Sequence, residues 1–305
     1  MEALFNSWSS FLKPDTAIRR VVLNELKIIT ESDFHNFPLP REELEKIKRW
    51  AGLQGEPSFL GSGTMGNAYQ FGDRVLKLTS DYDEALAASA ISGKRHPNVY
   101  NIHGVARRFD PKDRSSMAKP HWSYAIVYDL VGEVGGIELP NKEQQDVILS
   151  IHASTDQIWY NWDHDAFELF ERFVQWAQQN PEIIEAQPAT RRYNSYKEKF
   201  ELLMDYAGFD AGEKKILSNT WRLAVGMTSY KYDLRSAEEI RDVYEHNKTK
   251  IKAINDISKG LTFLSKNGII YKDLKTTNVM QDDGDLVIID IGKSAVSGYH
   301  PVETI

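Results

Sequence analysis

The chain has 305 residues, of which 41% are hydrophobic and 27% are charged, the balance of a folded globular protein. Its net charge of −7 and its basic stretches of only two residues argue against a protein that binds the phosphate backbone of nucleic acids. There is no cysteine, so disulfides and thiolate chemistry are excluded. The first residues lack the basic region and apolar run of a signal peptide, and no apolar stretch reaches about 18 residues. We therefore expect a cytoplasmic protein that does not contact a membrane.

The first fifty-five residues have the pattern of helices. Residues 18–29 are rich in apolar side chains, and Pro40 is suited to the first turn of a helix over residues 41–50. We interpret residues 1–55 as a helical extension and not as part of an active centre.

Short β-prone runs punctuated by glycine follow this extension. The runs are residues 58–60, 67–71, 74–79 and 124–130. The Gly72-Asp73 pair predicts a tight hairpin between the second and third runs. An alanine-rich helix is expected over residues 83–91. Residues 56–131 therefore predict a small antiparallel sheet with one helix.

From residue 141 to about residue 226 the helical period dominates. Four of the seven tryptophans lie here: Trp159, Trp162, Trp176 and Trp221. Bulky aromatic residues at this density more often build a core than a ligand cage, so we predict a packed helical subdomain within residues 132–237. Ser236 and Glu239 then form a capping-box pair that opens a long helix toward Lys266.

A G-x-G-x-x-G pattern formed by Gly61, Gly63 and Gly66 lies between two expected strands. Glycines allow backbone N–H groups to approach phosphate oxygens because no Cβ stands in the way. A strand and a hairpin follow the third glycine, whereas the dinucleotide-binding fingerprint requires a helix there. By itself the pattern also describes an ordinary glycine turn.

Lys77 lies inside an apolar strand, where an ammonium group needs an anionic partner. A nucleotide phosphate and a carboxylate would both serve. Glu84, at the start of the next helix, is the natural carboxylate, and Asp81 and Asp83 are nearby rivals. The plainer alternative is an edge-strand lysine that reaches water.

The strongest pattern is Tyr-Lys-Asp-Leu-Lys-Thr-Thr-Asn at residues 271–278, followed by an apolar run that leads to Asp290-Ile-Gly. Asn278 and Asp290 offer hard oxygen donors for Mg²⁺, and Asp273 is left to orient a hydroxyl group. Solvated acidic turns would not account for Asp273 and Asp290, because both lie in apolar surroundings.

Taken together, these residues resemble the protein-kinase signature set, over residues 58–131 and 255–294. The resemblance implies that Gly61, Gly63 and Gly66 cover the phosphates of ATP, and that Lys77 holds them with Glu84 as its helix partner.

The same resemblance extends to the segment 124–131, which is similar to the fifth strand and hinge of the family. It implies that Tyr128 is the gatekeeper and that backbone groups of Asp129 and Val131 contact adenine.

In the catalytic segment the resemblance implies that Asp273 is the catalytic base and Lys275 a contact to the γ-phosphate, with Asn278 and Asp290 as ligands of Mg²⁺. Lysine two positions after the base resembles serine/threonine kinases, whereas aminoglycoside-type phosphotransferases usually place histidine there. We therefore expect a bilobal α+β protein-kinase-like fold and an enzyme that transfers phosphate from ATP to a protein hydroxyl.

The sequence departs from the family pattern at Tyr271, Lys272 and Ile291, which replace histidine, arginine and phenylalanine. The interval before Asp273 is long, and the sequence given stops fifteen residues after Asp290. We expect residues 132–237 to act as part of the C-lobe, and residues 238–305 to carry the catalytic loop and metal ligands of a shortened lobe.

Two other functions fit the same residues. The first is a small-molecule kinase of this fold, similar to antibiotic or choline kinases, in which the helical block forms an acceptor pocket. The second is a nucleotide-binding pseudokinase that presents the helical block to a partner. Lys275 favours a protein acceptor, and the presence of Lys77, Asp273 and Asp290 together favours an active enzyme.

Overall fold

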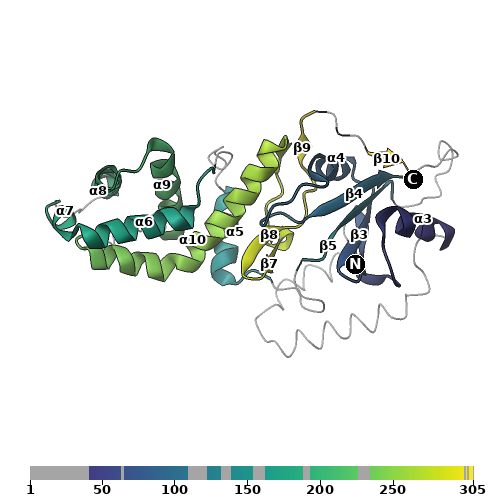
Figure 1. Cartoon of the computed structure of the whole chain (residues 1–305), viewed down its shortest axis with the longest axis horizontal. Coiled ribbons are helices and arrows are strands. Elements are labelled where there is room, and N and C mark those ends of the chain that lie inside the picture. The colour runs from purple at the N-terminus through teal and green to yellow at the C-terminus, as the bar shows by residue number, and fades with distance from the viewer. Residues whose placement is uncertain are drawn as a thin grey trace, which may run out of the picture.

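The computed structural model is an α+β structure with an antiparallel sheet at one end and helices at the other (Figure 1). It describes residues 41–62, 65–108, 122–131, 139–153, 162–187, 193–225, 234–298, 300 and 302–304. The helix expected over residues 18–29 lies outside the described residues.

The described part of the chain forms one large sheet with the strand order β1-β2-β3-β5-β4-β10. The strands are β1 (Ser58–Ser62), β2 (Gly66–Phe71), β3 (Arg74–Thr79), β4 (Ile102–Arg107), β5 (Tyr124–Asp129) and β10 (Glu303–Thr304). The first five pair with their neighbours in antiparallel fashion, whereas β10 lies parallel to β4. Neither β4 nor β10 was predicted from the sequence.

The hairpin between β2 and β3 confirms the turn predicted at Gly72-Asp73. Gly72 has a φ of +62°, a left-handed conformation that suits glycine, and Phe71 pairs with Arg74 across the turn. At the far end of the hairpin, a Cβ on Gly66 would lie 2.1 Å from the carbonyl oxygen of Leu78. Glycine at position 66 is therefore needed for β2 to approach β3 this closely.

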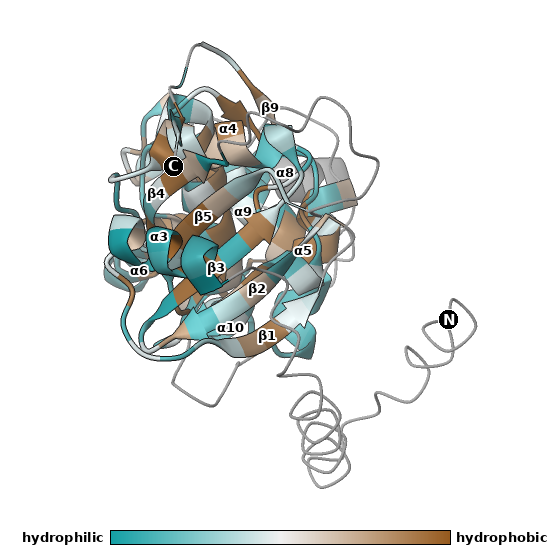
Figure 2. Cartoon of the chain, turned by 90° about the vertical axis from the view of Figure 1, so that its right-hand side faces the viewer, coloured by the Kyte–Doolittle hydropathy of each residue, from teal (hydrophilic) through white to brown (hydrophobic). Residues whose placement is uncertain are grey.

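Helices cover the two faces of this sheet. α4 (Tyr82–Ile91) packs with Ile126 in the larger hydrophobic core, and α3 (Arg41–Ala51) packs with Val127 in a separate one. Because successive strand residues point to opposite faces, these two cores lie on opposite sides of β5. Figure 2 shows hydrophilic residues on the outer surface of α3, whose Leu44 and Ile47 are buried.

The helical end of the molecule contains α5 (Lys142–Ala153), α6 (Ala166–Gln179), α7 (Pro181–Glu185), α8 (Tyr193–Tyr206), α9 (Ala211–Val225) and α10 (Ala237–Lys266). Helices α6 to α9 gather around the first part of α10, at the end of the molecule remote from the large sheet (Figure 1). None of the helices in the described ranges combines the length and the apolar character that a membrane crossing requires.

Aromatic side chains form the centre of this helical block. Phe173 lies edge-on to Phe200, with ring centroids 5.3 Å apart, and Phe200 contacts Trp221 at 4.7 Å. All three are buried, as is Trp162, so the structure confirms the prediction of an aromatic core. Trp162 precedes α6 and does not lie in a helix, and Trp159 lies outside the described residues.

The long helix α10 connects the helical block to the short elements that follow residue 266. Its start is capped as predicted, because Ser236 Oγ accepts a hydrogen bond from Glu239 N at 3.2 Å. Near its other end, a Cβ on Gly260 would lie 2.8 Å from the carbonyl oxygen of Asn98. Glycine thus lets α10 approach the segment that links α4 to β4.

After α10 the chain forms short elements that surround the candidate site. These are β6 (Ile269–Ile270), the 3₁₀ turn η4 (Thr276–Asn278), β7 (Val279–Asp282), β8 (Asp285–Ile288) and β9 (Ala295–Val296). β7 and β8 form the predicted hairpin, and β6 pairs with β9. The turn between β7 and β8 uses the left-handed residues Asp283 and Gly284.

Candidate active site

Lys77 lies at the centre of the first group of site residues. It is on β3, between β2 and β5, so the alternative of an edge-strand lysine is wrong. Its Nζ forms an ion pair with Glu84 on α4 and lies 3.6 Å from Asp290 Oδ1. Asp81, considered as a rival partner, instead caps α4 by accepting hydrogen bonds from the backbone N–H groups of Asp83 and Glu84.

The charges of this cluster depend on one another. Burial alone would lower the pKa of Lys77, but the carboxylates of Glu84 and Asp290 outweigh that effect and raise it. Burial also raises the pKa of Glu84, against the opposing effect of the Lys77 ammonium group. Lys77 therefore stays charged in a partly buried position, where an anionic ligand is attracted to it.

Asp290 reaches this cluster from beyond the β7–β8 hairpin. The sequence placed it at the end of the apolar strand, but β8 ends at Ile288, two residues earlier. Ile289 N still donates to the carbonyl oxygen of Asn278 at 3.0 Å, in register with the β7–β8 pairing, and Asp290 follows directly after this bond. Asp290 Oδ1 then accepts a hydrogen bond from Gly292 N at 2.9 Å, which fixes the carboxylate.

A second group of site residues is joined by hydrogen bonds in the loop before β7. Asp273 Oδ2 accepts from Lys275 Nζ at 2.7 Å and from Asn278 Nδ2 at 3.1 Å. Asn278 Nδ2 also donates to the carbonyl oxygen of Asp273 at 2.9 Å. Tyr271, which stands where the kinase pattern has histidine, donates its hydroxyl to the same carbonyl at 3.0 Å. The loop is therefore held in one conformation by its own side chains.

The surroundings of Asp273 favour its charged form. Burial would raise its pKa, but hydrogen bonds and positive charge from Lys275, together with Asn278 and the charge of Lys293, lower it overall. Asp273 is thus a carboxylate at neutral pH, the form that accepts a hydrogen bond from a hydroxyl group.

The donor atoms of Asn278 and Asp290 suit Mg²⁺. Asn278 uses its amide nitrogen to hold Asp273, so its amide oxygen faces the other way. Within the described residues this oxygen accepts only a long hydrogen bond, at 3.4 Å, from Thr277. The described residues contain no group of three or more His, Asp or Glu side chains that could hold a metal ion. Mg²⁺ commonly takes one or two protein oxygens together with phosphate oxygens and water, and this pair supplies that number.

The glycine pattern lies at the tip of the first hairpin. Gly61 pairs with Ala68 just after an irregularity in β1, and Gly66 begins β2. Gly63 lies outside the described residues. The two described glycines therefore flank the tip of this turn, and their role in binding phosphate stays a prediction.

The expected adenine-binding residues lie at the end of β5. Asp129 N donates to the carbonyl oxygen of Asn101 at 3.0 Å, and its carboxylate contacts His103 and Asn101. Sequence reasoning missed this contact with His103, for which no motif gives a signal. Val131 is buried just beyond the strand, and Tyr128 lies edge-on to Tyr100 with ring centroids 4.8 Å apart.

Lys293 is a further site residue that sequence reasoning missed. Its Nζ lies 3.8 Å from Asp273 Oδ1, whereas Lys275 contacts the other carboxylate oxygen, Oδ2. Its position directly after Asp290-Ile-Gly could have indicated it, because a chain that brings Asp290 to the site also brings the next residues close to Asp273.

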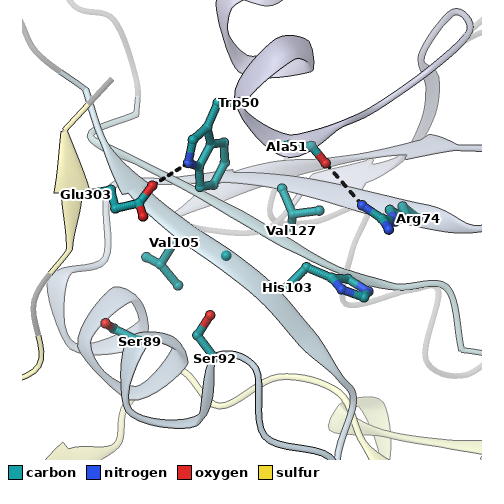
Figure 3. Close-up of a pocket in the computed structure, with 10 residues that line it drawn as sticks. Trp50, Ala51, Arg74, Ser89, Ser92, His103, Val105, Val127 and Glu303 are labelled. Atoms are coloured by element: carbon teal, nitrogen blue, oxygen red, sulfur yellow. Dashed lines mark hydrogen bonds between the residues drawn. The ribbon is translucent and has the colours of Figure 1, made fainter.

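A pocket of about 460 Å³ lies elsewhere, at the edge of the large sheet (Figure 3). Its lining includes Trp50, Arg74, Ser89, Ser92, His103 and Glu303. Trp50 Nε1 donates to Glu303 Oε2 at 2.7 Å, which ties α3 to β10. None of the predicted site residues lines this pocket, so it is separate from the candidate active site.

Comparison with family models gave no match. Kinase suppressor of Ras 2 of Homo sapiens is 41% identical over 76 residues, which is 25% of this chain and 8% of the relative. Serine/threonine-protein kinase STY17 of Arabidopsis thaliana is 40% identical over 58 residues, 18% of this chain and 10% of the relative. The matches thus span a tenth or less of the length of these relatives.

Solved structures superpose only loosely on the chain. The streptomycin–ATP complex of APH(2")-IIa has a TM-score of 0.29 at 10% identity, covering 85% of this chain and 72% of that one. Spectinomycin phosphotransferase APH(9)-Ia, in complex with ADP and spectinomycin, has a TM-score of 0.30 at 16% identity, covering 85% and 70%.

The arrangement of the elements and the similarity to kinase sequences together identify the fold. An antiparallel sheet carries one helix whose Glu84 pairs with Lys77, and helices follow at the other end. Segments of the chain are 40–41% identical to proteins named as kinases. The chain has a protein-kinase-like fold.

Proposed function

We propose that this protein is an ATP- and Mg²⁺-dependent phosphotransferase that transfers the γ-phosphate of ATP to a serine or threonine hydroxyl of a protein. The observation that supports it most is the convergence of Lys77, Glu84 and Asp290. Lys77 lies on a strand and Glu84 on the helix that follows it, whereas Asp290 lies in a loop near the other end of the chain, yet both carboxylates lie within ion-pair distance of one ammonium group. Such a convergence suits the binding of a nucleotide phosphate beside a metal ion.

In this proposal each residue has one task. Lys77 holds phosphate oxygens and is itself held by Glu84. Asn278 and Asp290 bind Mg²⁺, which supplies positive charge to the phosphates when it is bound. Asp273 accepts the hydrogen bond of the acceptor hydroxyl and orients it for in-line attack, and Lys275 offsets the negative charge on the transferred group.

The nucleotide would be covered by the first hairpin and the end of β5. Gly61, Gly63 and Gly66 would let backbone N–H groups approach the phosphates, and backbone groups of Asp129 and Val131 would bind adenine. Because Asp129 N already donates to Asn101, its carbonyl oxygen is the group left for the adenine amino group.

A protein acceptor is favoured by Lys275, which stands two residues after Asp273 and donates to its carboxylate. The similarity to a relative named as a serine/threonine-protein kinase supports the same acceptor, over the 58 residues that match.

We further propose that residues 56–131 form the N-lobe, and that the helical block 132–237 belongs to the C-lobe together with residues 238–305. The packing of α10 supports the assignment of the block to the C-lobe, because α10 contacts α5, α6 and α9 of the block as well as β6 and β8 beyond it.

The direct test is transfer from γ-labelled ATP in the presence of Mg²⁺. The purified protein is incubated alone, with a mixture of proteins, and with small hydroxyl compounds such as aminoglycosides or choline. Label on protein serine or threonine supports the proposal, and Asp290→Ala or excess chelator should abolish it. Label only on small molecules shows a small-molecule kinase, and binding of ATP without any transfer shows a pseudokinase.

A further inference from the structure

The backbone at Lys293 has a conformation that L residues other than glycine rarely adopt. Its φ is +54°, in the left-handed region, directly after Gly292. Another left-handed non-glycine residue, Asp283, lies in a hairpin turn where that conformation is common. Lys293 lies in a turn outside any hairpin, where a left-handed position favours glycine or asparagine over lysine, and residues held in such conformations gather at functional sites.

The strained conformation goes together with a specific position of the side chain. The Nζ of Lys293 lies 3.8 Å from Asp273 Oδ1, while the side chain keeps 74% of its surface exposed. An exposed ion pair at this distance contributes little to stability, so stability does not explain why lysine is held here.

The two oxygens of Asp273 have different surroundings. Oδ2 accepts hydrogen bonds from Lys275 and Asn278. Within the described residues, no group donates a hydrogen bond to Oδ1, beside which only the Lys293 ammonium group forms an ion pair. An incoming hydroxyl would therefore donate to Oδ1 and would meet Lys293 as it does so.

We propose that Lys293 determines the acceptor: it selects hydroxyl groups that have an anionic group next to them, such as a serine or threonine flanked by aspartate or glutamate. This inference rests on the proposed function. The physical reason is that an exposed ammonium beside the reacting hydroxyl attracts a neighbouring carboxylate and repels a neighbouring lysine. Lys275 donates to Oδ2 and has the transferred phosphate as its proposed task, whereas Lys293 lies beside Oδ1 and can turn toward the acceptor.

The experiment uses two sets of peptides that contain the same central serine or threonine, flanked either by glutamate and aspartate or by lysine. The wild-type chain should phosphorylate the acidic set with a kcat/KM about tenfold higher than the basic set, an effect that shrinks with added salt. Lys293→Asn, which keeps a residue tolerant of the left-handed conformation, should remove the preference. Lys293→Glu should reverse it.

A matched control is Lys266→Asn, which removes another exposed lysine, at the end of α10, that pairs with Asp163. It should leave the preference as in the wild type. The KM for ATP should stay unchanged in the Lys293 variants, because the change concerns the acceptor.

The outcomes separate this inference from the function on which it rests. Equal rates on both peptide sets, or a preference that survives Lys293→Glu, overturn the role of Lys293 and leave a protein kinase standing. If neither set is phosphorylated while a small hydroxyl compound is, the protein acceptor is wrong and the inference falls with it.

Discussion

The two groups of charged residues in the candidate site differ in how the protein encloses them. Around Lys77, the side chains of Glu84 and Lys77 are only 3% and 21% exposed. Around Asp273, the side chains of Lys275 and Lys293 are 47% and 74% exposed. Glu84 and Lys77 have their charges fixed by the protein, as the proposed nucleotide binding requires, while Asp290 of this group is 37% exposed. The open group leaves its charges accessible to an acceptor that arrives from solution.

The largest effect is expected in the open group. Asp273→Asn keeps the size of the side chain but removes the carboxylate, so the rate of phosphate transfer should fall by about 10²–10⁴-fold. The rate is measured at saturating ATP, with circular dichroism to show that the fold is retained. Lys142→Gln, which removes an exposed lysine paired with Asp146, serves as a control and should not change the rate. Wild-type turnover in Asp273→Asn would remove this residue from the mechanism.

In the enclosed group the loss of one partner should also cost stability. Lys77→Met leaves Glu84 buried without its cation, which should lower the free energy of unfolding by about 2–4 kcal/mol. Because the pKa of Glu84 is already raised, the variant should become less stable as the pH rises through that pKa and the buried carboxyl group must ionise.

The double variant Lys77→Met, Glu84→Gln supplies the control for this effect. It removes the unpaired charge, so most of the lost stability should return and the pH dependence should disappear. The measurement is chemical denaturation at several pH values. Equal stability of the single and double variants would show that the buried carboxylate is not the cause.

A smaller effect on stability concerns the segment between α4 and β4, which contains His96 and Asn98. His96 stacks on Phe263 of α10, with ring centroids 4.8 Å apart, and its Nδ1 accepts a hydrogen bond from Asn98 N. The carbonyl oxygen of Asn98 in turn accepts from Ile288 N at the end of β8. Burial, aided by the charge of Lys259, lowers the pKa of His96 from 6.5 to about 4.

The sign of the resulting pH dependence follows from this lowered pKa. The unfolded chain binds a proton at His96 below about pH 6.5, whereas the folded chain resists it down to about 4. Stability should therefore fall by about 1–3 kcal/mol as the pH drops through this window. His96→Asn should lack this part of the loss. A wild type and variant with parallel stability curves between pH 6.5 and 4 would contradict the assignment.

The smallest effect is expected outside both groups, at the pocket in Figure 3. Trp50→Phe removes the hydrogen bond to Glu303 but keeps an aromatic ring over Gly104. Because Glu303 is exposed, the cost should be about 0.5–1 kcal/mol, with no change in transfer rate. Thermal denaturation measures it, and Glu303→Gln should behave similarly. A large loss of transfer in either variant would connect this pocket to the active site.

The parts that sequence predicts are those that local chemistry decides. The turn at Gly72 needs a left-handed residue, and the cap at Ser236 needs a hydroxyl beside the first helical turn, so both can be found without the fold. The pair Lys77 and Glu84 could be predicted because a strand and the helix after it fix their separation.

The parts that sequence misses depend on contacts between distant segments. Trp50 and Glu303 are 253 positions apart, and β10 joins β4 only because the chain returns to the sheet after β9. Lys293 meets Asp273 through a backbone conformation that no residue preference indicates.

The central claim is that the Lys77 group binds ATP and the Asp273 group acts in transfer. It is tested most directly by measuring ATP affinity and transfer rate side by side in Lys77→Met and Asp273→Asn. Isothermal calorimetry with Mg²⁺ gives the affinity, and single-turnover transfer of the labelled γ-phosphate gives the rate. We predict that Lys77→Met loses both, and that Asp273→Asn binds ATP like the wild type but transfers at least about a hundredfold more slowly. Wild-type ATP affinity in Lys77→Met, or weak ATP binding in a folded Asp273→Asn variant, would contradict the division.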